Sequence, residues 1–513
     1  MSSGKRMLGG FLTVGFWTLM SRVLGFVRDV MIAAFLGTGP AAQAFIVAFS
    51  LPNMFRRFFA EGAFNMAFVP MFSKKLEAGD DALGFARDAF SGLATILITL
   101  TVIAILLMPW LVWAMASGFV GDQRFDLAVN YGRIAFPYIL FISLAALLSG
   151  VLNAMHRFAA AAAAPVLLNV IFIAALLIAN SSGFDIGLTL AWMVPIAGIV
   201  QLALVWIAAK RAGFALLPRR PVLTPDLKRL AIIAAPAALA GGVVQVNLLV
   251  GRQVASQFDS AVAWLYNADR LYQLPLGVVG IAIGIVLLPE LSRRLQAGDE
   301  TGGQEAFSRA GEISLALTIP AAVALVVIPF PLIEVLFERG RFGPQDTEAT
   351  AAAVLIYGLG LPAFVLQKVY QPLFFARADT KRPFYYALVA MVINAAFAIG
   401  LAPTIGYLAA AVGASLAGWG MVAQLWMGSR KMGTSAHFDA RFKSRIWRIV
   451  LASLIMGAVL IAGQLLLNPM FGAGAWRYLA LVLLVTLGVG SYFGTGQLIG
   501  AFKPADFRRS MRR

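Results

Sequence analysis

The chain has 513 residues, of which 60% are hydrophobic and only 13% are charged, and its formal net charge is +17. A mean hydropathy of +0.83 excludes a soluble globular domain, and the absence of cysteine excludes disulfides and thiolate metal sites. The basic residues are scattered over many short loops instead of forming one surface, which excludes nucleic acid as a partner.

Apolar stretches long enough to cross a membrane as helices recur along the chain. None shows the ten-residue alternation of a transmembrane β-strand, so we predict an all-α, polytopic membrane protein with fourteen transmembrane helices. In chain order, the predicted spans are 8–36, 41–71, 83–117, 126–155, 160–180, 186–209, 230–258, 261–292, 310–337, 347–376, 382–402, 406–428, 446–468 and 476–500.

The loops between these spans differ strongly in their content of Lys and Arg. Every second loop, counted from the N-terminus, is rich in basic residues, whereas the alternate loops hold only Arg124, Arg339, Arg341 and Arg477. Because basic loops stay in the cytoplasm, both termini are predicted to be cytoplasmic. This orientation requires an even number of helices.

Two similar segments indicate an internal duplication. VPMFSKKL at 69–76 and LPELSRRL at 288–295 are 219 residues apart, and each closes a predicted helix on the cytoplasmic side. Because an even number of spans separates them, the copies would be parallel repeats with a central cavity between the halves. The last two helices lie outside both copies.

Eight cations fall inside predicted spans instead of loops: Arg22, Arg28, Arg56, Arg57, Arg133, Arg252, Arg270 and Lys368. A cation at the centre of a membrane helix costs roughly 3 kcal/mol, so such residues normally face a protein interior or a watery cavity. Acidic residues at similar depth are fewer, chiefly Asp29, Glu61 and Asp269. A positive surplus therefore remains.

Helix geometry predicts some pairs among these charges. Arg57 and Glu61 are four residues apart and share a face, and Arg22 and Asp29 are seven apart and share a stripe. In a straight helix Arg28 would point about 120° away from Arg22, although Gly25 between them could allow a bend. Surplus guanidinium groups suit a phosphate or pyrophosphate, which they can bind through two parallel hydrogen bonds.

Four segments of the chain resemble those of a known family: SRVLGFVRD at 21–29, LPNMFRRFFAEGAFNMAFVP at 51–70, FPYILFISLAALLSGVLNAMHRF at 136–158, and YNADRLYQLPLGVVGIAIGIVLLPELSR at 266–293. That family is the MurJ (MviN) flippases, of the multidrug/oligosaccharidyl-lipid/polysaccharide exporter superfamily. Its members move lipid II across the bacterial cytoplasmic membrane for peptidoglycan synthesis. The resemblance runs from about residue 8 to beyond 430.

The resemblance implies two six-helix lobes followed by two helices that form a lipid-binding groove, over 1–220, 221–435 and 436–513. It also implies that the pyrophosphate and sugars of lipid II are held by arginines lining a central cavity, which correspond to Arg22, Arg28, Arg56 and Arg270. Further substrate-binding candidates in matching segments are Ser21, Asp29, Glu61, Asn169 and Asp269. Other cations expected to line the cavity or to act in coupling are Arg57, Arg252 and Lys368.

The chain departs from the family pattern where energy coupling is concerned. Some members bind sodium through acids on helices seven and eleven, where this chain has Gly251 and Ala398. We therefore expect no metal site and no cofactor. The sequence also lacks a nucleotide-binding loop, so the membrane potential or a proton gradient is the expected driving force. Gln43 stands where some relatives carry an acid.

Three alternatives to a lipid II flippase were weighed. A flippase for another polyprenyl-linked saccharide would share the electrostatics, whereas an organic-cation or drug antiporter should present carboxylates in its cavity. A membrane enzyme would need intramembrane histidines or paired carboxylates, but His156 and His437 fall in predicted loops. The expected partners are lipid II, membrane lipids and other cell-wall synthesis proteins, in the bacterial cytoplasmic membrane.

Overall fold

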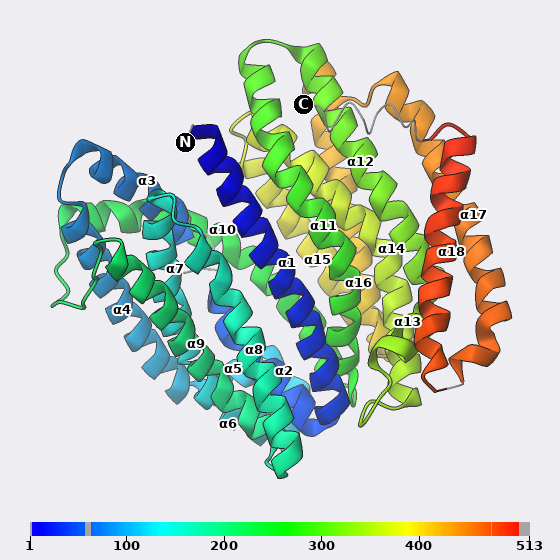
Figure 1. The fold of residues 1–513 in the computed structure, drawn as a ribbon, viewed down its shortest axis with the longest axis horizontal. Coiled ribbons are helices and arrows are strands. Elements are labelled where there is room, and N and C mark those ends of the chain that lie inside the picture. The colour runs from blue at the N-terminus through cyan, green and yellow to red at the C-terminus, as the bar shows by residue number, and fades with distance from the viewer. Residues whose placement is uncertain (1–2, 57–62, 473, 502–513) are drawn as a thin grey trace. The chain divides into compact units, whose positions relative to one another are not determined.

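Each of the fourteen predicted spans falls on one helix or on two consecutive helices of the computed structural model (Figure 1). The structure describes residues 3–56, 63–472 and 474–501. Ten helical segments of these residues are long and apolar enough to cross a membrane. The chain is therefore an all-α, multi-pass membrane protein, as predicted, while the number of fourteen crossings stays a prediction.

The first of two compact units contains residues 1–263 together with 339–342. Within this unit α1 packs against α8, α2 against α6, α7 and α8 against α9, and α10 against α3. Its helices are α1 (Ser3–Leu36), α2 (Pro40–Arg56), α3 (Ala63–Ala78), α4 (Ala82–Leu106), α5 (Met108–Met115), the 3-10 helix η2 (Ser117–Phe119), α6 (Gln123–Ala135), α7 (Tyr138–Ala154), α8 (Ala159–Ser182), α9 (Ile186–Arg211) and α10 (Pro225–Ser256).

The second unit contains residues 264–338 and 343–513. Here α12 packs against α14 and α17, α14 and α15 against α16, and α17 against α18. Its helices are α11 (Ala261–Gln296), α12 (Glu300–Val327), α13 (Pro329–Phe337), α14 (Pro344–Phe375), α15 (Lys381–Ile405), α16 (Leu408–Ser429), the 3-10 helix η3 (Thr434–Ala436), α17 (Ala440–Phe471) and α18 (Trp476–Leu498).

The two units are defined by their packing, so the predicted lobes over 1–220, 221–435 and 436–513 stay a prediction. The first unit extends to Ala263, because α10 packs against α3 and α4. Lys75 Nζ, near the end of α3, lies 3.1 Å from the carboxylate of Asp226 at the start of α10. The predicted third region, 436–513, belongs to the second unit, where Arg445 of α17 donates a 2.5 Å hydrogen bond to Glu312 of α12.

Prolines explain why three predicted spans are each built from two helices. Pro109 lies in the first turn of α5, Pro137 immediately precedes α7, and Pro329 begins α13. Proline lacks a backbone N–H and disfavours the continuation of a helix, although α14 runs through Pro362, and it fits the first turn of a new helix. The spans 83–117, 126–155 and 310–337 are therefore interrupted while their second halves stay helical.

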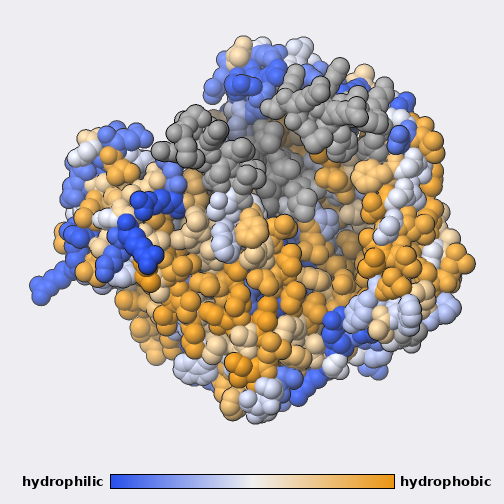
Figure 2. All heavy atoms as spheres, viewed as in Figure 1, coloured by the Kyte–Doolittle hydropathy of each residue, from blue (hydrophilic) through white to orange (hydrophobic). Residues whose placement is uncertain are grey.

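The exposed side chains of the helices are those expected of a protein surrounded by lipid. Figure 2 shows hydrophobic side chains over the middle of the helices and hydrophilic ones toward helix ends. Leu465 and Leu466 on α17 are 72% and 80% exposed. Large aliphatic side chains in such number on a surface are stable when lipid tails, not water, surround them.

Candidate functional site

Arg28 is the centre of a buried polar cluster in the first unit. Its side chain is held by Asp29, whose Oδ1 accepts hydrogen bonds from Nε at 3.0 Å and Nη2 at 2.7 Å. Nη1 donates to Oδ1 of Asn169 at 2.9 Å. Arg28, Asp29 and Asn169 are only 8%, 3% and 4% exposed, so the bonds form away from bulk solvent and are correspondingly strong.

Asn169 connects this cluster to the preceding turns of α1. Its Nδ2 donates to the main-chain oxygen of Ser21 at 2.9 Å and lies 3.4 Å from the Ser21 hydroxyl. Gly25 lies between Ser21 and Arg28, and a Cβ there would stand 3.6 Å from Nδ2 of Asn169. That distance is ordinary van der Waals contact, so the spacing of α1 and α8 does not require glycine here. The Asn169 amide contacts α1 both at Ser21 and at Arg28.

An aromatic group supports the cluster from α2 and α8. The guanidinium carbon of Arg28 lies 5.7 Å from the ring centroid of Phe172, within the range of a cation–π contact. Phe172 is fully buried and also contacts the rings of Phe45 and Phe49, at 6.3 Å and 5.8 Å between centroids. Arg28 is thus held in place by polar partners and by packing. The sequence did not indicate that Phe172 contacts Arg28.

The predicted pairing of Asp29 with Arg22 is wrong, because Asp29 pairs with the adjacent Arg28. Neighbours on a helix diverge by about 100°, but the long arginine side chain reaches the shorter carboxylate. Among the described residues Arg22 is exposed and has no polar partner. Arg56 at the end of α2 and Arg252 in α10 are half-buried. Arg57 and Glu61 lie outside the described residues.

The remaining predicted residues belong to the second unit. Asp269 and Arg270 are consecutive in α11, where Asp269 accepts a hydrogen bond from Gln273 and the Arg270 guanidinium lies 4.4 Å from the ring centroid of Tyr266. Both residues are half-buried. Lys368 on α14 is exposed. The structure therefore unites Ser21, Arg28, Asp29 and Asn169, and places Asp269 and Arg270 together in their own unit.

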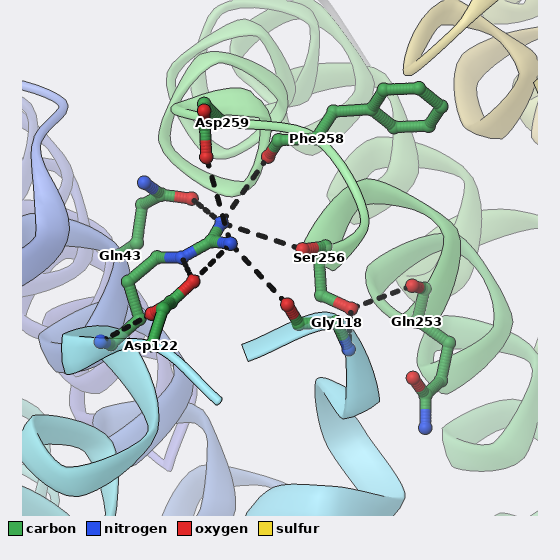
Figure 3. Close-up of polar contacts among 8 residues, drawn as sticks. Gln43, Gly118, Asp122, Gln253, Ser256, Phe258 and Asp259 are labelled. Carbon is green, nitrogen blue, oxygen red and sulfur yellow. Dashed lines mark hydrogen bonds and ion pairs between the residues drawn. The ribbon is translucent and has the colours of Figure 1, made fainter. Parts of the chain in front are cut away.

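A second buried arginine, Arg124 at the start of α6, was assigned from the sequence to a loop. It is only 7% exposed, and its Nε donates to Oδ2 of Asp122 at 2.7 Å. Its terminal nitrogens also lie 3.3–3.5 Å from oxygens of η2, α2 and the end of α10, as Figure 3 shows for its partners Gly118, Gln43, Ser256 and Phe258. No local sequence pattern indicated these contacts.

The Arg124 cluster joins helix ends. Asp122 caps the N-terminus of α6 by accepting a hydrogen bond from the Arg124 backbone N–H at 2.6 Å. Partial burial would raise the pKa of Asp122, but the hydrogen bonds from Arg124 outweigh it and hold that pKa below its usual value. Beside it, Gln253 of α10 accepts from the Ser117 backbone N–H at 2.8 Å. These contacts fasten the end of α10 to η2 and α6.

The two positions at which some family members carry sodium-binding acids lie in different units of this chain. Gly251 is half-buried in α10, and Ala398 is fully buried in α15. Neither residue has a side-chain oxygen that could serve as a ligand for a hard cation. Over the described ranges, no group of three or more His, Asp or Glu side chains is arranged to hold a metal ion.

Comparison with known proteins gives concordant matches. The family model described as "Lipid II flippase MurJ" matches residues 32–487. A "Probable lipid II flippase MurJ" of Rhizobium meliloti is 45% identical, over 98% of this chain and 96% of the relative. A solved structure titled "Lipid II flippase MurJ, inward closed conformation" has a TM-score of 0.78 at 24% identity, over 98% of this chain and 100% of that chain. An inward-facing multidrug transporter of the MATE family has a TM-score of 0.69 at 14% identity, over 81% and 95% of the two chains, and shares the fold.

Proposed function

The chain belongs to the MurJ family of lipid II flippases, and from this premise we propose that Arg28, held by Asp29 and Asn169, receives the pyrophosphate of lipid II during transport. The protein is a transporter and not an enzyme. It moves lipid II from the cytoplasmic to the periplasmic leaflet by alternating access, so that its cavity opens to one side of the membrane at a time.

The observation that carries this proposal is the way in which Arg28 is bonded. A guanidinium group has five N–H donors, and the three hydrogen bonds to Asp29 and Asn169 use Nε and one hydrogen on each terminal nitrogen. Among the described residues, one N–H on Nη1 and one on Nη2 remain without a protein acceptor. An N–H group on each of the two terminal nitrogens can donate to the oxygens of a phosphate.

Fixing the guanidinium in advance lowers the cost of binding. A free arginine side chain loses considerable rotamer freedom when it grips a ligand, whereas Arg28 is already oriented by Asp29, Asn169 and the Phe172 ring. Asp29 offsets the charge of Arg28 and so lowers the free-energy cost of burying the guanidinium before the substrate binds. The net positive charge for the substrate must therefore come from other cations.

We assign that role to Arg22, Arg56 and Arg270. Arg22 is exposed and has no polar partner in the described part of the chain, so its side chain can change rotamer to stay in contact with a moving anion. Arg270 is oriented by the face of Tyr266. The family resemblance maps all three residues onto arginines that hold the pyrophosphate and sugars. Ser21, which contacts Asn169, and Asp269, which precedes Arg270 in α11, are further substrate-binding candidates. Lys368, Arg57 and Arg252 complete the proposed set of cavity or coupling cations.

The proposed setting is the bacterial cytoplasmic membrane, with both termini in the cytoplasm, as the distribution of basic loops predicts. Other proteins of cell-wall synthesis would supply and consume lipid II on the two sides. Depletion of the chain in cells tests the function, with lipid II on the outer leaflet as the readout. Exposure should fall on depletion and recover with the wild-type gene but not with Arg28→Ala. Unchanged exposure on depletion would contradict the flippase function.

Energy coupling has its own test. With Gly251 and Ala398 at the positions of the family's sodium-binding acids, we expect transport in vesicles to be the same when potassium replaces sodium. Collapsing the membrane potential or the proton gradient should slow it, since a potential of 100 mV contributes about 2.3 kcal/mol per charge moved. A strict sodium requirement would show that this chain holds the cation with other residues.

A further inference from the structure

A slot lined by aromatic and aliphatic side chains opens on the second unit, between α14, α16 and the start of α17. Its volume is about 420 Å³, and its lining is almost wholly apolar. One wall is a single face of α16, formed by Trp419, Ala423 and Trp426. Trp419 and Trp426 are 43% and 48% exposed, so the slot is open to the surroundings of the helix.

The opposite wall is rigid. Phe438 stacks on Phe442 with 3.8 Å between ring centroids and on Phe307 with 4.5 Å. Tyr370 of α14 meets the edge of the Phe438 ring at 5.9 Å. Phe442 and Phe307 are buried. A slot between packed aromatic rings keeps its shape without a ligand, as most ligand pockets do.

Positive charge lies at one end of the slot. Arg430 directly follows α16, and its guanidinium carbon lies 4.8 Å from the ring centroid of Trp426. Lys431 is the next residue in the chain. The acid of the following segment, Asp439, is engaged by Arg309 and by the Phe442 backbone N–H, and Arg441 pairs with Glu312 at 3.5 Å. Arg430 therefore places positive charge beside the Trp426 wall of the slot.

The first unit has a corresponding pair, a lysine over a tryptophan, in which the indole is bonded to the chain that follows its helix. Lys210 lies 5.3 Å from the ring centroid of Trp206 near the end of α9. This pair precedes Trp426 and Arg430 by 220 residues, close to the 219 that separate VPMFSKKL from LPELSRRL. There, however, the indole N–H donates to the Leu216 main-chain oxygen at 2.8 Å, and Leu216 is fully buried. The chain that follows α9 covers Trp206, whereas Trp426 stays open.

We propose that the slot binds one acyl chain of an anionic phospholipid of the surrounding membrane, with the lipid phosphate at Arg430. An apolar slot beside an exposed cation matches a molecule with a hydrocarbon chain and a negative head group. Trp426 serves both parts, because its ring lines the slot and supports the guanidinium. The bound lipid would join α16 to α17 in the same unit. This site is separate from the Arg28 cluster and does not depend on the identity of the transported lipid.

The test is a titration of the detergent-purified chain with phosphatidylglycerol, followed by native mass spectrometry. Phosphatidylcholine serves as the zwitterionic control. Arg430→Gln should weaken phosphatidylglycerol binding about fivefold, the equivalent of ~1 kcal/mol for one cation near a lipid phosphate. Ala423→Phe should fill the slot and abolish the tightest binding event, and both variants should bind phosphatidylcholine equally poorly.

Lys210→Gln is the matched control, because it removes a cation over a tryptophan whose indole N–H is bonded to the Leu216 main-chain oxygen. It should bind phosphatidylglycerol as the wild type does. An equal loss in Lys210→Gln would reduce the effect to general surface charge and overturn the proposal. Tight binding that survives both Arg430→Gln and Ala423→Phe would also overturn it. Displacement of phosphatidylglycerol by undecaprenyl phosphate at equal concentration would assign the slot to the tail of the transported lipid instead.

Discussion

Arg28 and Arg124 are two buried arginines of the first unit, 8% and 7% exposed, and each has a carboxylate partner within 3 Å. Their other partners differ. Arg28 is held by side chains in the middle of helices, Asp29 and Asn169, and retains N–H donors for a ligand. Arg124 faces main-chain oxygens at helix ends, at Gly118, Ser256 and Phe258.

This difference distinguishes the proposed ligand site at Arg28 from the structural contacts of Arg124. Carbonyl oxygens at the end of α10 lack partners within their own helix, and Arg124 supplies them with donors. The N–H donors of Arg124 therefore bond to oxygens of the protein itself. The partners of Arg28 instead orient its guanidinium and balance its charge. Burial of an arginine in a membrane protein is therefore not a sign of substrate binding until its partners are known.

The largest effect is expected at Arg28. Arg28→Lys keeps the charge but loses the paired N–H groups, so lipid II export should fall about 100-fold, as expected from two charge-assisted hydrogen bonds of ~1.5 kcal/mol each. The measurement is lipid II exposure on the outer leaflet at equal membrane level of protein. In Arg28→Lys the carboxylate of Asp29 has a poorer partner, which could lower stability. The double variant Arg28→Lys with Asp29→Asn removes this carboxylate charge, so it should restore folding without restoring export. Export by Arg28→Lys at half the wild-type rate or more would move the anion site elsewhere.

Arg124→Ala should affect stability instead of transport. Loss of the bonds to Asp122 and to the end of α10 should lower the free energy of unfolding by about 2 kcal/mol, measured by thermal unfolding in detergent. Because the pKa of Asp122 is lowered in the fold, its contribution is present above pH 4 and is lost as the pH falls through that lowered value. The stability difference between wild type and variant should shrink accordingly in acid. A loss of transport without a loss of stability would give Arg124 a direct role.

Asn169→Ala tests the link between α1 and α8. It removes the acceptor for Nη1 of Arg28 and the donor to the Ser21 oxygen, so transport should fall about tenfold, the equivalent of ~1.4 kcal/mol, with the guanidinium still present. Asn169→Asp keeps an acceptor for Arg28 and should recover part of this loss. If Asn169→Ala transports as well as the wild type, Arg28 does not need this partner for its orientation.

The smallest effect is expected at Asp259, which belongs to the Arg124 group only by proximity. Its carboxylate lies 3.6 Å from Arg124 Nη2, but its side chain is 98% exposed (Figure 3). Exposed ion pairs contribute little because water and salt screen them. Asp259→Asn should therefore leave both the thermal midpoint and lipid II export unchanged within error. A clear loss of stability would mean that the cluster depends on its outer charge as well as on Asp122.

The sequence predicted the helices well because membrane-spanning helices can be recognised from the length and hydropathy of their apolar segments. The breaks at Pro109 and Pro329 follow from the chemistry of proline, but hydropathy alone merged the helices on either side. The division after Ala263 could not be predicted, because it depends on how α10 packs against α3. The lobe boundary at residue 220 came from the family resemblance and stays a prediction.

The candidate site was predicted in part. Resemblance to the family brought Ser21, Arg28, Asp29 and Asn169 onto one set of candidates, and the structure joins them. The geometric pairing of Arg22 with Asp29 failed, because helical spacing ignores the reach of a long side chain. Arg124 was missed since its partners Gln43 and Ser256 lie 81 and 132 residues away in the chain, beyond the reach of any local pattern.

The central claim is that Arg28, and not every buried arginine, receives the pyrophosphate. Direct binding of lipid II to the purified wild type, Arg28→Lys and Arg124→Ala tests it, at a temperature where all three are shown to be folded. Arg28→Lys should bind about 100-fold more weakly than the wild type, for the loss of ~3 kcal/mol, while Arg124→Ala should bind with unchanged affinity. Wild-type affinity in Arg28→Lys, or an equal loss in both variants, would contradict the account.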